Sequence, residues 1–274
     1  MLRLVMGLVL ALSCVAGQAA AQDRRENWRL CANKDRQPPE VPIRACSAII
    51  AAGQESDADL ASAFYNRGIA HDDSRMYDQA IADYTEAIRL DPSDPSHFYN
   101  RGNSHSAKRD YARAIADYDQ TIKMKPGHVN AWGNRGNQWQ RQGQFDKALA
   151  DYTGALRIDP NHVNSLSSRC WTHVRLDRLA AALADCDASL GLRPEHADTL
   201  DSRGFVHLRL GNADAAVADY DAALRLDPRQ ATSLYGRGVA KRRKGDTAGA
   251  EVDIAAAVKI SAGIAREMER YGLK

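Results

Sequence analysis

The chain has 274 residues, of which 44% are hydrophobic and 26% are charged, and its 37 lysines and arginines nearly balance its 35 acidic residues. A formal net charge of +2 gives no general attraction to phosphate backbones, so nucleic acid is not expected as a partner. The charged share argues against a polytopic membrane protein, and the apolar share argues against a disordered chain.

The first 21 residues are typical of a secretory signal peptide. Arg3 supplies a positive start, residues 4–17 are uncharged and largely apolar, and the alanines at 19–21 suit a cleavage site. The apolar run is shorter than the about 20 residues that span a bilayer as a helix. We therefore predict cleavage after Ala21, a periplasmic or secreted protein, and no stable membrane span. Acylation of Cys14 is the alternative, because residues 12–14 loosely resemble a bacterial lipoprotein signal.

Residues 22–60 are predicted to form an N-terminal arm and a degenerate cap helix. Prolines at 38, 39 and 42 favour irregular chain over residues 22–42, whereas residues 43–52 have helical apolar spacing. In the repeat register given below, Cys46 takes the place of the repeated alanine and Ile50 that of an aromatic residue. If the chain is exported, disulfides are the default expectation for the four cysteines that follow the signal peptide.

A period of 34 residues governs the rest of the chain. Arginine recurs at this spacing, glycine follows it in every unit but one, and aspartate recurs 16 residues after each arginine. The arginines are Arg67, Arg101, Arg135, Arg169, Arg203 and Arg237, and the aspartates are Asp83, Asp117, Asp151, Asp185, Asp219 and Asp253. With Ala61 as position 1, the six units are 61–94, 95–128, 129–162, 163–196, 197–230 and 231–264.

Each unit is predicted to be a helical hairpin. Apolar residues at helical spacing form two blocks per unit, and polar or glycine-containing turns such as residues 141–144 separate the blocks. The second helix should end before a proline such as Pro92, because proline disfavours helical geometry in the preceding residue. Each hairpin leaves an apolar face that only a neighbour can cover, so residues 265–274 are expected to form a C-terminal capping helix.

The repeat carries the pattern of a known family. In the third unit Trp132 stands at position 4, Gly136 at 8, Ala148 at 20, Tyr152 at 24 and Pro160 at 32. This pattern resembles the tetratricopeptide repeat family over residues 61–264. The resemblance implies an all-α solenoid of six helix-turn-helix repeats with N- and C-terminal capping helices. Departures include arginine at position 7, where that family usually has leucine.

Folding each hairpin about positions 15 and 16 brings positions 7 and 23 to the same height, as it does positions 8 and 24. We therefore predict arginine–aspartate pairs such as Arg135 with Asp151, with separately solvated side chains as the alternative. The same reasoning predicts a Cys170–Cys186 disulfide, with two buried free thiols as the alternative. A Cys31–Cys46 disulfide would then tie the N-terminal arm to its cap helix.

Catalytic and metal-binding patterns are not found in the sequence. Position 11 holds His71, His105, His173 and His207, but equivalent positions on successive units lie too far apart for one metal ion. A second histidine series at position 34, which comprises His128, His162 and His196, is expected to cap the next helix. No glycine-rich phosphate loop or nucleophile elbow is present. We expect a noncatalytic protein with no cofactor and no metal.

The resemblance implies a concave groove lined by the first helices of the repeats. Carried over to this sequence, its exposed positions give a polar N-terminal part and a C-terminal part with two aromatics beside four arginines at position 13. The predicted groove residues are Tyr65, Asn66, Tyr99, Asn100, Asn103, Asn134, Asn137, Arg141, Trp171, Arg175, Phe205, Arg209 and Arg243. Such an arginine stripe suits a ligand with acidic residues or a terminal carboxylate, although it could equally be a solubilising face.

Two functions fit this sequence. The favoured one is a noncatalytic scaffold or adaptor that binds an extended peptide or a partner helix in the groove. The alternative is a soluble receptor for a small ligand or glycan, in which Trp171, Phe205 and the arginines form a pocket. The sequence does not identify the partner, the pathway or the oligomeric state.

Overall fold

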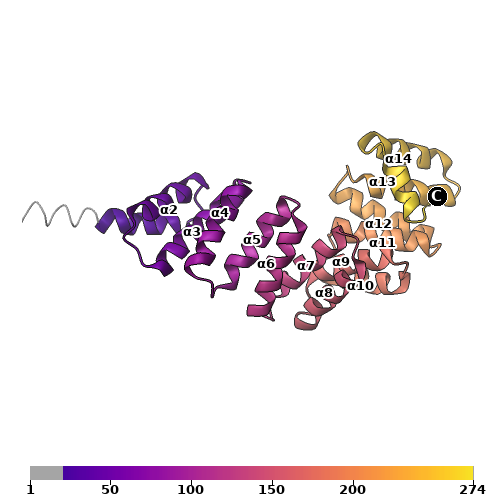
Figure 1. Ribbon diagram of the computed structural model, residues 1–274. Helices are drawn as coiled ribbons and strands as arrows, with labels where there is room; N and C mark the ends of the chain where they lie inside the picture. Colours follow the sequence, from indigo (N-terminus) through magenta and orange to yellow (C-terminus); the bar gives the residue numbers. More distant parts are fainter. Residues whose placement is uncertain (1–20, 274) are drawn as a thin grey trace, which may run out of the picture. The chain divides into compact units, whose positions relative to one another are not determined.

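A computed structural model describes residues 21–273, and these residues form helices joined by short turns with no strand among them (Figure 1). The all-α prediction is confirmed for this part of the chain. Apart from Ala21, the predicted signal peptide lies outside the described residues. None of the helices within residues 21–273 is long and apolar enough to cross a membrane. The described residues divide into two compact units on either side of the boundary between Pro126 and Gly127.

The first unit contains three helical hairpins among its described residues. Residues 21–31 are helical and pair with α2 (Glu40–Ala52). The prediction of an irregular arm over residues 22–42 is therefore wrong for residues 22–31 and for residues 40–42, which begin α2. The next hairpins are α3 (Asp57–Asp73) with α4 (Tyr77–Leu90) and α5 (Pro95–Ala107) with α6 (Tyr111–Met124).

The second unit continues the same pattern with one hairpin to each 34-residue unit. Its hairpins are α7 (Val129–Arg141) with α8 (Phe145–Ile158), α9 (Val163–Arg175) with α10 (Leu179–Leu192), α11 (Ala197–Arg209) with α12 (Ala213–Leu226), and α13 (Ala231–Arg243) with α14 (Thr247–Ile260). The chain ends in a short helix, α15 (Ile264–Arg270). The first helices α7, α9, α11 and α13 also pack against their counterparts in adjacent hairpins.

The local sequence explains where each hairpin turns and ends. Asp91 follows α4 with extended φ and ψ of −134° and 89°, as expected for the residue before Pro92. At position 15 the chain adopts positive φ, which is 74° at Gly143 and 62° at Arg109. This left-handed residue reverses the chain after the first helix and directs it into the second.

Close helix contact at positions 8 and 24 holds each hairpin together. A Cβ atom added to Gly136 would lie 2.7 Å from Cε1 of Tyr152, so the tyrosine ring fills the space that the glycine leaves. Tyr152 is fully buried by this contact. In hairpin α9/α10 the same two positions hold Cys170 and Cys186, whose sulfur atoms lie at bonding distance, which confirms the predicted pairing.

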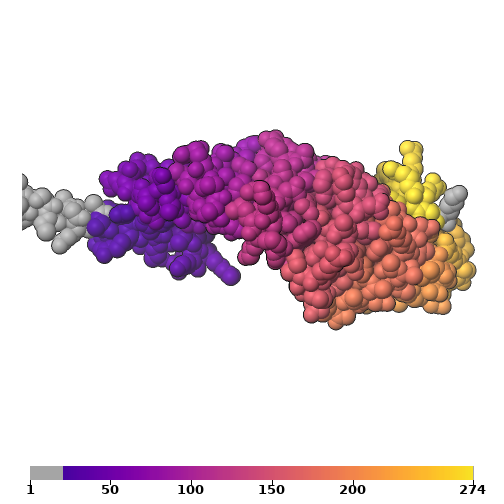
Figure 2. Space-filling model, turned by 60° about the horizontal axis from the view of Figure 1, so that its bottom comes forward, coloured from indigo at the N-terminus to yellow at the C-terminus, as the bar shows by residue number. Residues whose placement is uncertain are grey.

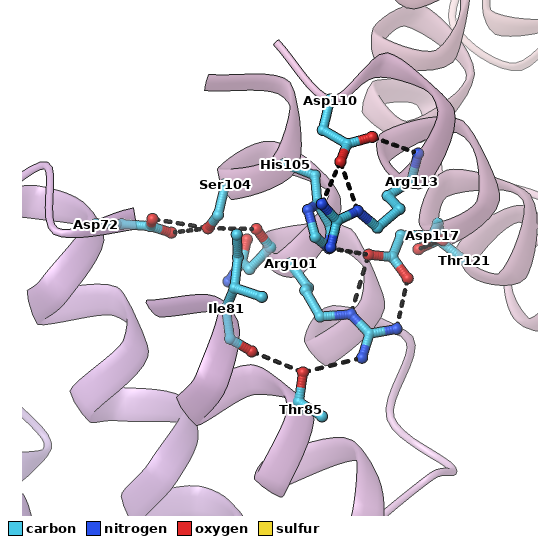
Figure 3. A network of polar contacts seen from close by, with 11 residues as sticks. Asp72, Ile81, Thr85, Arg101, Ser104, His105, Asp110, Arg113, Asp117 and Thr121 are labelled. Carbon is cyan, nitrogen blue, oxygen red and sulfur yellow. Dashed lines mark hydrogen bonds and ion pairs between the residues drawn. The ribbon is translucent and has the colours of Figure 1, made fainter. Parts of the chain in front are cut away.

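The arginine–aspartate pairs predicted at positions 7 and 23 form in all six hairpins from α3/α4 to α13/α14. In hairpin α5/α6, Nε and Nη2 of Arg101 donate to the two oxygens of Asp117 at 3.0 and 2.7 Å (Figure 3). The third nitrogen, Nη1, donates to Thr85 of the preceding hairpin at 3.2 Å. One guanidinium therefore joins both helices of its own hairpin to the hairpin before it.

The N-terminal hairpin follows the repeat with its second helix displaced by one turn. Arg67 donates to Ser47, so Ser47 takes the place that Thr85 occupies opposite Arg101. This register equates Cys46 with position 24, four residues from the position predicted by unbroken counting. The Cys31–Cys46 pairing is confirmed, with sulfur atoms at bonding distance, and it is the counterpart of the disulfide in hairpin α9/α10.

The histidines at position 11 lie against the aspartates of position 23. Nδ1 of His71 lies 2.9 Å from Asp83, and Nε2 of His105 lies 3.9 Å from Asp117. The aspartate therefore faces a basic residue from position 11 as well as the arginine from position 7. The structural interpretation of these histidines is supported, because His71 and His105 are both at least nine-tenths buried.

Two of these histidines should make the stability of the fold sensitive to pH. Loss of hydration lowers the pKa of His105 and of His173, because it disfavours the charged imidazolium more than Asp117 or Asp185 favours it. The unfolded chain therefore binds protons first as the pH falls. The contribution of these histidines to the free energy of unfolding should be complete above the ordinary histidine pKa of about 6.5 and should be lost progressively as the pH falls below it.

Denaturant unfolding between pH 8 and pH 5 tests this prediction. The double variant H105Q/H173Q should lose less of its unfolding free energy over that interval than the unmodified protein does. An equal loss in both proteins would show that these two imidazoles do not cause the pH dependence.

Candidate functional site

The inner helices of the second unit border a set of adjoining hollows. The first hollow has a volume of about 250 Å³ and lies between α7, α9 and the start of α11. Its walls are almost entirely amide, hydroxyl and imidazole groups, supplied by Asn130, Asn134, Asn137, Tyr152, His162, Asn164, Ser165, Ser167, Ser168 and His196, together with Gly133 and Asp198. Such groups both donate and accept hydrogen bonds, which suits a peptide main chain.

The second hollow is larger and less polar. It has a volume of about 350 Å³, and Trp171, Phe205 and Tyr271 form its aromatic side. Carboxylates of Asp198, Asp201 and Glu267 also border it. Burial raises the pKa of Asp201 to about 6, although a hydrogen bond from Ser233 favours its charged form.

Shared residues make these hollows one continuous surface. Ser168 borders the first hollow, the second, and a third that contains Arg141 and Phe145. Arg175 links the third hollow to a fourth, which Arg209 also borders. The surface, called the inner surface below, thus runs over α7, α9 and α11 and reaches the C-terminal residues.

The asparagines predicted for the groove are partly engaged within the protein. In the second unit, the hydroxyl of Tyr152 donates to Oδ1 of Asn137 at 2.8 Å. Asn134 lies on the wall of the first hollow, where its main-chain oxygen accepts a hydrogen bond from Gln138. Asn137 therefore positions a buried tyrosine and borders the surface at the same time.

The predicted residues of the first unit lie on α3 and α5. The amide of Asn100 donates to the hydroxyl of Tyr65 at 2.9 Å, and the ring of Tyr65 packs 5.1 Å from His97. The hydroxyl of Tyr118 donates to Asn103, which repeats the arrangement of Tyr152 and Asn137. The ring of Tyr99 lies 5.9 Å from that of Tyr118. Asn66 is partly exposed on α3.

Trp171 and Phe205 meet a third aromatic residue that sequence analysis did not place at the site. The ring centroids of Trp171 and Tyr271 lie 5.5 Å apart, and those of Trp171 and Phe205 lie 5.7 Å apart. Both pairs are edge-to-face, which is the favoured geometry for aromatic rings. Phe205 is only 1% exposed, so the expectation that it would be an open groove residue is corrected.

Three of the four arginines predicted as a cationic stripe make contacts within the protein. Arg209 donates to the main-chain oxygen of Tyr271 and to Asp177, each at 2.7 Å. Arg243 donates to the main-chain oxygen of Leu208. Arg175 lies between two rings, 4.7 Å from the centroid of Phe145 and 4.6 Å from that of Tyr271. Arg141 borders the third hollow.

Two of the three histidines at position 34 cap the next helix, as predicted. Nδ1 of His128 accepts from the main-chain nitrogen of Ala131, and Nδ1 of His196 accepts from that of Thr199. His162 instead contacts the side chains of Ser165 and Asn130 on the wall of the first hollow. Within residues 21–273, no group of three histidine, cysteine or acidic side chains is arranged to hold a metal ion.

Family comparison matches most of the chain. A model of the tetratricopeptide repeat matches residues 61–94, and another model of this repeat matches residues 99–163, 140–197 and 203–263. None of the curated proteins compared with the chain matches it.

Solved structures show the same fold at low sequence identity. A tetratricopeptide repeat protein from Parabacteroides merdae is 15% identical, with a TM-score of 0.69 over 92% of this chain and 98% of that one. PilF of Pseudomonas aeruginosa is 14% identical, with a TM-score of 0.68 over 80% and 99%. YrrB, described as a TPR protein with an unusual peptide-binding site, is 21% identical, with a TM-score of 0.55 over 68% and 97%.

The tyrosines at position 24 provide a test of how the inner surface is built. Tyr152 bonds to Asn137 and Gln140, whereas the buried hydroxyl of Tyr220 has no partner among the described residues, because Phe205 and Leu208 stand at those two positions. Tyr220→Phe should leave the free energy of unfolding unchanged or raise it by up to about 1 kcal/mol. Tyr152→Phe should lower it by about 1 kcal/mol. Denaturant unfolding measures the free energy of both variants. Equal losses of free energy in the two variants would contradict the predicted difference between the two tyrosines.

Proposed function

The chain belongs to the tetratricopeptide repeat family, and from this premise we propose that it is a noncatalytic scaffold whose inner surface binds an extended segment of a partner protein. One observation carries the proposal: the hollows along α7, α9 and α11 adjoin through shared residues such as Ser168. A continuous surface of this kind suits an extended chain better than a compact molecule.

The chemistry of the inner surface differs from hollow to hollow, so each hollow favours a different kind of group on the partner. Amide and hydroxyl groups in the first hollow can hydrogen bond to main-chain groups. Arg141 and Arg175 border the third hollow and favour acidic side chains there. Asp198 and Glu267 border the second hollow and favour basic or neutral polar side chains. The partner segment proposed here therefore carries charges of both signs at separate positions.

Export is part of the proposal. The apolar N-terminal run with alanines at 19–21 favours removal of a signal peptide and a periplasmic or secreted location, with a lipid-anchored form through Cys14 as the alternative. Two cysteine pairs at disulfide distance are compatible with an oxidising compartment.

The second hollow favours an alternative function. Its aromatic side, formed by Trp171, Phe205 and Tyr271, and its three carboxylates could enclose a small ligand or a sugar ring. Such a receptor would depend on Trp171 alone, whereas a scaffold would need residues from several hairpins. Loss of binding on Trp171→Ala without any effect of changes on α7 would favour the receptor.

Site-specific crosslinking tests the scaffold. A photoreactive amino acid at Ser168, which borders three hollows, should give discrete adducts with a partner protein when the tagged protein is expressed in its native cells. The same amino acid at Val252, which is 69% exposed on α14, is the matched control and should give none. Mass spectrometry of the adducts then identifies the partner.

A charged substitution at Ser168 measures how far binding of that partner depends on the inner surface. Ser168→Arg should reduce capture of the crosslinked partner at least tenfold, because the new side chain fills the junction of the hollows. Val252→Arg should leave capture unchanged. Undiminished capture by a cooperatively folded S168R variant would refute the inner surface as the binding site.

A further inference from the structure

The C-terminal helix does not close the end of the stack as an end cap would. At position 28, Leu156, Leu190 and Leu224 are each less than 10% exposed, whereas Val258 of the last hairpin is 41% exposed. The apolar position that the next hairpin covers elsewhere thus remains open to solvent in the last hairpin after α15 has formed.

The last residues pack on the inner helices instead. Helix α15 contacts α13 and, to a smaller extent, α14, and its apolar residues Ile264 and Met268 are 1% and 3% exposed. Beyond the helix, Tyr271 reaches Trp171 on α9 and Phe205 on α11, and Leu273 is fully buried. In Figure 1 the yellow C-terminal segment turns back beside α13, and Figure 2 shows the last residues at the surface of the second unit.

Tyr271 is bound in the way that a peptide ligand would be. Its ring forms edge-to-face pairs with Trp171 and Phe205, and it stacks with the guanidinium of Arg175 at 4.6 Å. Its main-chain oxygen accepts a hydrogen bond of 2.7 Å from Arg209. Side-chain recognition and main-chain recognition therefore occur at one residue.

We propose that Trp171, Arg175, Phe205 and Arg209 form a seat for a peptide segment with an aromatic residue followed two positions later by an aliphatic one, and that residues 264–273 occupy this seat until such a segment displaces them. The proposal rests on the scaffold function and specifies the partner sequence that binds where the inner surface reaches the C-terminal residues. Tyr271 and Leu273 supply the two anchors in the chain's own segment, and Gly272 between them has positive φ, 85°.

The chain's own segment competes with a partner for the seat and so weakens the apparent affinity of the partner. A tethered ligand acts at an effective concentration in the millimolar range, so a partner competes with it at every encounter. The apparent dissociation constant of the partner equals its intrinsic value divided by the fraction of molecules with an open seat. Weakening the chain's own segment should therefore tighten binding of the partner.

Fluorescence anisotropy with a labelled synthetic peptide tests the seat. The probe has the sequence of residues 264–274, and the control peptide has alanine in place of its tyrosine. Full-length Tyr271→Ala should bind the probe at least tenfold more tightly than the unmodified protein, because the aromatic seat is then empty. Glu269→Ala, an exposed substitution in the same helix, should bind as the unmodified protein does. Adding Trp171→Ala to Tyr271→Ala should abolish the gain.

Equal binding of the probe by Tyr271→Ala and the unmodified protein would overturn the proposal. If Tyr271→Ala does not fold, hydrogen exchange on the unmodified protein decides: saturating probe, but not the alanine control, should accelerate exchange in residues 264–273. Unchanged exchange would also overturn it.

The two proposals can fail separately. If Ser168→Arg prevents capture of the crosslinked partner but Tyr271→Ala does not increase its affinity, the scaffold function stands and displacement of the C-terminal residues is refuted. If Ser168→Arg has no effect on capture, the scaffold function itself is refuted.

Discussion

The arginine–aspartate pair at positions 7 and 23 is the contact on which the inner surface depends. The guanidinium is planar and has five donors, so it can hold both oxygens of one carboxylate and still reach a third acceptor. In hairpin α11/α12, Arg203 bonds to Asp219 at 2.9 and 2.7 Å and to Asp187 of the preceding hairpin at 2.8 Å. Asp219 is nearly buried, so the pair is largely protected from solvent screening. The repeated contact joins the first helix of a hairpin to the second helix of the hairpin before it.

Variation at positions 8, 9 and 24 changes the inner surface without changing the hairpin. Asn137 at position 9 presents an amide and satisfies the hydroxyl of Tyr152. Trp171 at the same position in the next hairpin coincides with a disulfide in place of the glycine–tyrosine contact, and no tyrosine hydroxyl then needs a partner. Phe205 offers no acceptor to the hydroxyl of Tyr220, which has no partner within residues 21–273. The fold thus accepts aromatic residues where the C-terminal segment binds and amides where it does not.

Much of this architecture could be predicted because it depends on contacts that recur at a fixed sequence distance. The 34-residue period gave the hairpins, and folding each hairpin about its turn gave the Arg135–Asp151 pair and the Cys170–Cys186 disulfide. The same counting misplaced Cys46, because the second helix of the N-terminal hairpin is shifted by one turn. Contacts that occur once in the chain carry no periodic signal. The bond from Arg209 to Tyr271, across 62 residues, is such a contact, and it changes the role of Arg209 from an open groove residue to one that holds the C-terminal segment.

A double-mutant cycle on Arg203 and Asp219 tests most directly whether these pairs hold the stack together. Arg203→Met, Asp219→Asn and the double variant are compared with the unmodified protein by denaturant unfolding. Charge-assisted hydrogen bonds in a nearly buried pair predict a coupling energy of about 1.5 to 3 kcal/mol. Arg203→Met should be the more damaging single change, because it leaves the buried carboxylate of Asp219 without its main partner, whereas in Asp219→Asn the partly exposed Arg203 keeps Asp187. Additive effects, with a coupling energy near zero, would contradict this account.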